Sequence, residues 1–98
     1  MKKIFKYPVR PGRFTLEMPE GAQPLRAMVQ GDGGQPQLWA LVDPSRPMTT
    51  RCFCAFGTGH EIDQADVPRI AFIDTFMLDG GALVFHLFEI KRWQTESQ

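Results

Sequence analysis

Turn-forming residues divide this sequence into short segments, and their spacing constrains the fold more than any other feature. The breaks are Pro11-Gly12, Pro19-Glu20-Gly21, Gly31-Asp32-Gly33-Gly34, Asp43-Pro44, Gly57-Thr58-Gly59 and Asp79-Gly80-Gly81. Glycine and proline clustered in this way favour turns. The segments between the breaks are therefore expected to be short elements joined by tight connections.

The hydrophobic pattern within the segments is that of β-strands. Phe14, Leu16 and Met18 alternate with polar residues, which places them on one face of a strand. Residues 38–42 and 83–85 are apolar throughout, as in strands covered on both faces. No window repeats apolar residues at helical spacing over three turns, so we predict only a single helical turn, over residues 61–67 and ended by Pro68.

We predict an all-β chain, either a small antiparallel β-sandwich or a partly closed barrel of about seven strands. The strands are expected near 2–9, 13–18, 25–31, 37–43, 49–56, 69–78 and 82–92. The last two flank Asp79-Gly80-Gly81, which indicates a β-hairpin. Residues 1–98 are predicted to form a single β domain, with its core in 1–93 and a frayed polar tail over 94–98.

Composition excludes several classes of protein. Apolar residues make up 43% and charged residues 22% of the 98, which suits a soluble globular fold. The formal net charge of zero gives no support to a nucleic-acid binder. No apolar run approaches the roughly 18 residues of a membrane span, and no signal-peptide core follows the basic start. We therefore expect a cytoplasmic protein with neither a membrane nor nucleic acid as a partner.

The two cysteines are predicted to be reduced. Cys52 and Cys54 are two residues apart on a predicted strand, so their Cα atoms would lie about 6.5–7 Å apart, at the upper limit for a disulfide. A metal site would need further ligands, and His60 and His86 are the histidines available. We predict neither a metal nor a cofactor.

Charge is distributed unevenly along the chain. Residues 1–26 hold six basic against two acidic residues, and residues 60–90 hold one basic against six acidic residues. The two regions are expected to be solvated faces that pair within the fold, or else a basic region that meets an anionic ligand or a neighbouring subunit. Because so short a chain can hardly cover both faces of its apolar strands, we also predict a homodimer or a larger homo-oligomer.

The segment from Gly57 to His60 is the candidate ligand loop. Two glycines around Thr58 would let backbone amides approach a ligand, and His60 would add a switchable charge. Without a following Lys-Ser/Thr, the loop is not a Walker-type phosphate loop, and a plain structural turn is the alternative interpretation. The predicted binding residues are Arg51, Gly57, Thr58, Gly59, His60 and Trp39, the last as a stacking platform.

Catalytic residues are not predicted. His86 alternates with Val84, Phe88 and Ile90 on the last long strand, which is typical of a histidine satisfied within a core. The sequence shows no set of nucleophile, base and orienting residue. Catalysis, by a small hydrolase using His60 or His86, is therefore the least favoured of the functions considered.

Four segments together resemble a family of small bacteriophage and prophage proteins of unknown function. They are Phe5-Lys6-Tyr7-Pro8, Leu38-Trp39-Ala40-Leu41-Val42-Asp43, Phe56-Gly57-Thr58-Gly59-His60 and the stretch from Gly80 to Glu89, which closes with Phe85-His86-Leu87-Phe88-Glu89. The resemblance covers about residues 3–90; members commonly have Trp where this chain has Phe85. It implies a phage-encoded accessory protein acting inside a bacterial host, and it transfers no catalytic residue.

Two non-enzymatic functions follow from these observations. The first is a protein–protein interaction with a host or virion protein, through an exposed aromatic patch or an edge strand. The alternative is sequestration of a small anionic, nucleotide-derived host signal in a pocket near the Gly-Thr-Gly-His loop.

Overall fold

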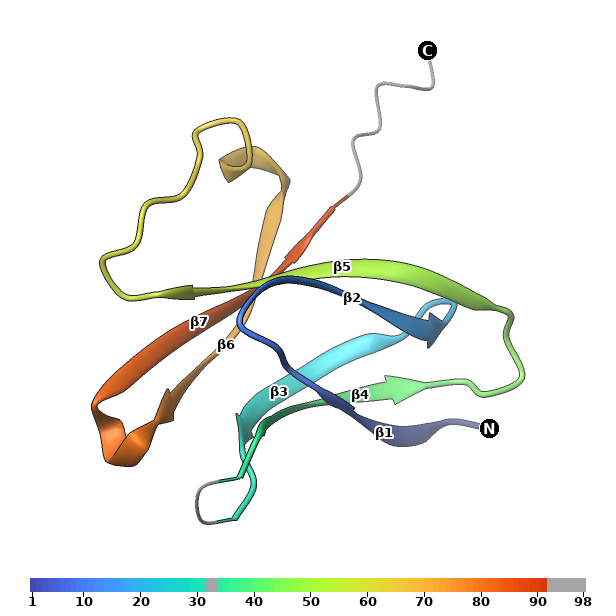
Figure 1. Ribbon diagram of the computed structural model, residues 1–98. Coiled ribbons are helices and arrows are strands. Elements are labelled where there is room, and N and C mark those ends of the chain that lie inside the picture. The colour runs from blue at the N-terminus through green and yellow to red at the C-terminus, as the bar shows by residue number, and fades with distance from the viewer. Residues whose placement is uncertain (32–33, 92–98) are drawn as a thin grey trace.

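The computed structural model describes residues 1–31 and 34–91, which form seven β-strands and two short 3₁₀ turns (Figure 1). The strands are β1 (Lys3–Pro8), β2 (Gly12–Pro19), β3 (Gln23–Val29), β4 (Pro36–Val42), β5 (Met48–Gly57), β6 (Ile70–Leu78) and β7 (Leu83–Ile90). Each begins and ends within two residues of the range predicted from the turn spacing. The all-β prediction is confirmed.

The strands form two antiparallel sheets. Sheet A has the order β1-β4-β3, and sheet B has the order β2-β5-β7-β6. The sheets face one another as a sandwich, and no backbone ladder joins them within the described residues. Of the two predicted architectures, the structure is therefore the sandwich, not closed into a barrel.

The core lies between the two sheets, and the alternation of each strand decides which side chains enter it. The strands of sheet B contribute Phe14, Leu16 and Met18 from β2, Phe53 and Ala55 from β5, Phe76 from β6 and Leu87 from β7. Sheet A contributes Ala27 from β3 and Leu38, Ala40 and Val42 from β4. Phe14 stacks on Phe53 with ring centroids 5.7 Å apart. Burial of these apolar surfaces is the main stabilising contribution to the fold.

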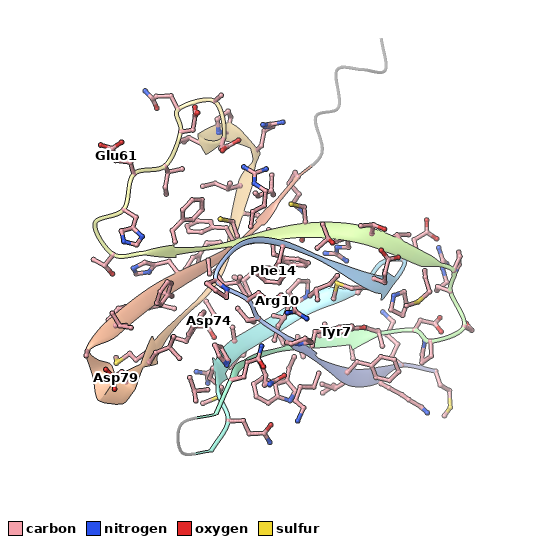
Figure 2. The ribbon with its side chains drawn as sticks, in the orientation of Figure 1. Tyr7, Arg10, Phe14, Glu61, Asp74 and Asp79 are labelled. Carbon is pink, nitrogen blue, oxygen red and sulfur yellow. The ribbon has the colours of Figure 1, made fainter. Side chains whose placement is uncertain are left out.

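A carboxylate side chain joins the sheets where β3 runs beside β6 (Figure 2). Both strands carry a bulge here, between Pro24 and Arg26 in β3 and between Phe72 and Asp74 in β6. Asp74 Oδ2 accepts a hydrogen bond from the Ala27 amide at 2.9 Å and lies 3.4 Å from Arg26 Nε. The side chain thus takes the place of a strand carbonyl at this seam.

The helical turn lies further along the chain than predicted. A 3₁₀ turn spans Val67–Arg69 and contains Pro68, where we expected a turn over 61–67 that Pro68 would end. Proline is tolerated in the first turn of a helix because the amide it lacks has no partner there. In the β6–β7 hairpin, Asp79 and Gly80 have φ values of 55° and 64°, a conformation that favours glycine at position 80. The predicted frayed tail, 94–98, and Trp93 lie outside the described residues.

Candidate functional site

The predicted ligand loop, residues 57–60, is a tight turn at the end of β5. The His60 amide donates to the Gly57 carbonyl at 3.0 Å, and the Thr58 amide donates to the Val84 carbonyl of β7 at 3.1 Å. Thr58, Gly59 and His60 are exposed. Because the amides of Thr58 and His60 already have partners inside the protein, the loop has the hydrogen bonding of a structural turn rather than that of an open amide cradle.

At each of the two glycines of this loop, the geometry disfavours any residue that carries a Cβ atom. A Cβ atom on Gly57 would lie 2.7 Å from Cε1 and 2.8 Å from Nδ1 of the His60 ring, which covers the Gly57 backbone. Gly59 has a φ of +89°, in the region that L side chains rarely adopt. The glycines thus make the turn and let the His60 ring lie on it.

Thr58 begins a chain of side-chain hydrogen bonds across sheet B. Its Oγ1 lies 2.7 Å from Nε2 of His86, and Nδ1 of His86 lies 3.0 Å from Oγ1 of Thr75. Thr75 and His86 are cross-strand partners in β6 and β7. His86 is therefore half-buried with both ring nitrogens satisfied, and it ties the 57–60 loop to the β6–β7 hairpin.

The chemistry available to this chain of groups is limited. Its order of hydroxyl, imidazole and third group is the order of a hydrolase triad, in which the third group is a carboxylate that stabilises the imidazolium. Here Thr75 supplies a neutral hydroxyl in place of the carboxylate. The Thr58 hydroxyl also lies 3.4 Å from the Val84 carbonyl, a second acceptor that competes for its proton. The geometry accounts for a structural pin and gives little support to a nucleophile.

Arg51 is turned away from the loop, although the sequence suggested that it would lie nearby. It lies on β5 six residues before Gly57, about 20 Å along an extended strand. Its guanidinium binds Glu89 of β7 through two hydrogen bonds, Nε to Oε2 at 2.7 Å and Nη2 to Oε1 at 2.8 Å. Nη1 donates to the carbonyl of Ala22. With side chains only 19% and 10% exposed, Arg51 and Glu89 form a shielded, bidentate ion pair at the rim of the core.

Tyr7, labelled in Figure 2, lies opposite the buried Leu38 on the inward side of β1, within electrostatic reach of Arg51. Its hydroxyl is buried and has no hydrogen-bond partner among the described residues. Burial raises the pKa of Tyr7 above its usual value of 10.0, and the positive charge of Arg51 opposes this effect. The same Arg51 has a raised pKa because Glu89 accepts its hydrogen bonds. The Tyr7 hydroxyl therefore keeps its proton at neutral pH in the folded protein.

Trp39 lies on the outer face of sheet A, far from the 57–60 loop. It is on the central strand β4, directly opposite Lys6 of β1 and Arg26 of β3. We call this surface the Trp39 face; it comprises Ile4, Lys6, Arg26, Met28, Trp39 and Leu41. Ile4 is 59% and Met28 42% exposed. The charged residues of this face are Lys6 and Arg26, and the strands of sheet A contain neither Asp nor Glu, so the surface is both apolar and basic.

The outer face of sheet B is apolar but carries a different pattern of charge. We call it the Phe72 face; it comprises Phe56, Phe72, Met77 and Phe88. Phe88 makes edge-to-face contacts with Phe56 and Phe72, with centroids 5.7 Å and 5.5 Å apart. Phe72 is 60% and Met77 61% exposed, and none of these four residues is charged.

Two ion pairs connect the basic first third of the chain to its acidic last third. Arg13 pairs with Asp66 at 3.3 Å, and Arg26 pairs with Asp74 at 3.4 Å. The uneven charge of the sequence is thus partly neutralised inside the fold. Lys6, in contrast, donates to the neutral Gln30 side chain at 2.8 Å, so its charge remains on the Trp39 face.

Three further features of the described residues concern metal ligands, thiols and helices long enough to span a membrane. No group of three or more His, Cys, Asp or Glu side chains there is placed to hold a metal ion. Cys52 and Cys54 are free thiols, as predicted, and burial raises the pKa of Cys54. No helix in this part of the chain has the length and apolar character needed to cross a membrane.

Comparison with known proteins identifies a family whose function is unknown. The family described as Domain of unknown function (DUF7352) matches residues 1–98, so the chain belongs to that family. No curated protein and no solved structure matches the chain. The site must therefore be interpreted from its own geometry.

Proposed function

We propose that this member of the DUF7352 family is a phage-encoded accessory protein that acts without catalysis, by binding an acidic surface of a host or virion protein. The Trp39 face carries the proposal. It presents a tryptophan at the centre of a sheet, flanked by a lysine and an arginine on the neighbouring strands. Tryptophan, methionine and arginine are enriched in protein interfaces, and tryptophan and arginine are among the residues that contribute most to binding.

Charge indicates the chemistry of the partner. A second copy of the Trp39 face would bring Lys6 against a like charge, because sheet A supplies no carboxylate and Arg26 is already paired with Asp74. A partner that carries Asp or Glu around an apolar or aromatic centre would satisfy both parts of the surface. The resemblance to phage and prophage proteins supports a partner found in a bacterial host.

The two alternatives have less support in the geometry. Sequestration of an anionic signal at the 57–60 loop would need Arg51 and free loop amides, but Arg51 binds Glu89, and two of the amides are bonded internally. Hydrolysis would need an activated hydroxyl, and the Thr58–His86–Thr75 chain lacks a carboxylate. Neither arrangement offers what the chemistry requires.

The test is a comparison of variants on the two outer faces. Wild-type protein, Trp39→Ala, Lys6→Glu and the control Phe72→Ser are immobilised, and bacterial proteins retained by each are identified and then purified for titration. We expect a partner held by the wild type and by Phe72→Ser, with affinity reduced about 30-fold or more by Trp39→Ala. Its binding should weaken as salt is raised, because exposed charges are screened.

Lys6→Glu provides the decisive variant. It reverses a charge on an exposed side chain without touching the core, so its circular dichroism should match that of the wild type. A partner that binds Lys6→Glu and Trp39→Ala as well as it binds the wild type would exclude the Trp39 face. A rise in melting temperature with nucleotides would instead favour the anionic-signal alternative.

A further inference from the structure

An apolar cavity opens between the two sheets near the link from β1 to β2. Its volume is about 160 Å³. It is lined by Val9, Arg10, Pro11, Gln35, Pro36, Ala55, Phe76, Leu78 and Phe85. Phe76 and Phe85 stack with centroids 5.9 Å apart and form one aromatic wall. The cavity lies on the inner side of the sheets and is separate from the Trp39 face, so it raises a question of its own.

The size and lining of the cavity define what can fill it. An engineered, enclosed apolar cavity of about 150 Å³ accepts benzene, and the present cavity has a similar volume but opens to solvent. A cavity of similar volume with two phenylalanine rings in its wall therefore suits a phenyl ring or a branched aliphatic group of comparable size. Filling it would remove apolar surface from water and restore contacts that the lining side chains lack.

Arg10, labelled in Figure 2, is the charged residue among those that line this cavity. The residue is exposed, and it makes no ion pair with any of the described residues. A guanidinium binds a carboxylate through two parallel hydrogen bonds. An apolar hole with one unpaired guanidinium beside it fits a ligand that has an apolar group next to a carboxylate.

The backbone around the cavity argues against a bound peptide. The Val9 amide donates to the Pro36 carbonyl at 3.0 Å, and the Val9 carbonyl accepts from the Gln35 side chain at 3.4 Å. Pro11 and Pro36 have no amide hydrogen to donate. A peptide main chain would therefore find few hydrogen-bond partners here, whereas a small acid needs none beyond Arg10.

We propose that this cavity binds a small free carboxylic acid with an aromatic or branched aliphatic group, which enters between the sheets while its carboxylate pairs with Arg10. The ligand does not depend on the protein–protein interaction proposed above. Either proposal can fail while the other stands, because the two surfaces share no residue.

Titration with three small probes tests the site by nuclear magnetic resonance on the full chain. The probes are phenylacetate, its neutral analogue phenylacetamide and acetate. For about ten heavy atoms, phenylacetate should bind with a Kd of about 1–10 mM and shift the amides of Val9, Arg10 and Phe85. Phenylacetamide should bind about tenfold more weakly, and acetate should cause no saturable shift.

Three variants separate the two parts of the site. Arg10→Gln should weaken phenylacetate about tenfold and leave phenylacetamide unchanged, because only the charge is lost. Ala55→Leu places a larger side chain in the cavity and should abolish binding of both. Lys3→Gln removes the same charge near the start of β1 and should change neither. If Ala55→Leu does not fold, the bulky probe diphenylacetate is used with the wild type in its place. Diphenylacetate should not bind, because it is too large for the cavity.

Three results would overturn the proposal. The first is absence of saturable shifts at the cavity up to 50 mM phenylacetate, well above the expected Kd. The second is equal loss of binding in Arg10→Gln and Lys3→Gln, which would show general charge attraction. The third is binding of acetyl-Gly-Gly-Phe at least tenfold tighter than phenylacetate, which would assign the cavity to the carboxyl terminus of a polypeptide.

Discussion

Arg51 illustrates how a single residue can be assigned to the wrong surface from sequence. As the only basic residue of β5, just before a glycine-rich loop, it was expected to serve that loop. In the structure it alternates with Phe53 and Ala55, on the inward face of the strand, and Glu89 likewise alternates with Leu87. Two opposite charges that share the core-facing positions of their strands are a signal for an internal ion pair. That signal was present in the sequence.

The Arg51–Glu89 pair should contribute strongly to stability, whereas an exposed pair should not. Arg51→Met leaves the shielded Glu89 carboxylate with only the exposed Lys91 ammonium, 4.0 Å away, as a counter-charge, so we expect the free energy of unfolding to fall by about 3 kcal/mol. Arg46→Met, which breaks a pair with Glu20 whose side chains are 53% and 51% exposed, should leave the free energy of unfolding nearly unchanged, because water screens an exposed pair. Urea denaturation measures both. Equal costs would show that the inner pair has no special role.

The unpaired Tyr7 hydroxyl leads to a prediction at neutral and at alkaline pH. Tyr7→Phe removes a buried polar group without a partner, so it should keep or raise the stability at pH 7, by about 1 kcal/mol. Burial raises the pKa of Tyr7, so the unfolded chain loses its phenolic proton first, near pH 10. The wild type should then lose stability above pH 10 as the pH rises toward the raised pKa, and Tyr7→Phe should lose less. Urea denaturation at pH 7, 10 and 11 compares them, and a variant less stable than wild type at pH 7 would contradict the prediction.

The strands themselves could be predicted from sequence, as could the pairing of β6 with β7 in their hairpin, whereas the other strand partners could not. Turn residues and alternation placed all seven elements to within two residues, because both signals are local. The pairing of β1 with β4 and of β2 with β5 depends on contacts between segments far apart in the chain, which no local pattern contains. The same limit applies to the site: the 57–60 loop was found, but its bond from Thr58 to His86 joins residues 28 positions apart.

The seam between β3 and β6 depends on one side chain, and this makes it testable at the level of elements. Asp74→Ala leaves the Ala27 amide without its acceptor, so we expect a loss of about 1.5–3 kcal/mol in the free energy of unfolding. Asp74→Asn retains a carbonyl oxygen at the same place and should cost less. Hydrogen exchange of the Ala27 amide provides a local measurement and should accelerate in Asp74→Ala. An unchanged exchange rate would show that the sheets hold together without this bond.

The molecule as a whole presents two apolar outer faces that differ in charge, and this difference assigns them to different partners. The Trp39 face carries the uncompensated charge of Lys6, which disfavours contact with a second copy of itself. The four residues of the Phe72 face are uncharged, and Arg13, which lies opposite Cys54 on the same side of sheet B, is paired with Asp66, so two copies can meet there with little repulsion. Exposed phenylalanine and methionine side chains grouped in this way are typical of interaction surfaces. The predicted homo-oligomer is therefore best placed on the Phe72 face.

Light scattering on three proteins tests this assignment. We expect the wild type at micromolar concentration to have at least twice the 11.1 kDa mass of one chain. Phe72→Ser should shift the equilibrium toward the monomer, because it removes a large exposed apolar side chain from the proposed contact. Trp39→Ala should leave the mass unchanged while abolishing binding of the acidic partner. If Trp39→Ala dissociates the oligomer and Phe72→Ser does not, the chain self-associates through the Trp39 face and the assignment is wrong. The charge of a face would then not determine whether it binds a second copy of the chain or another protein.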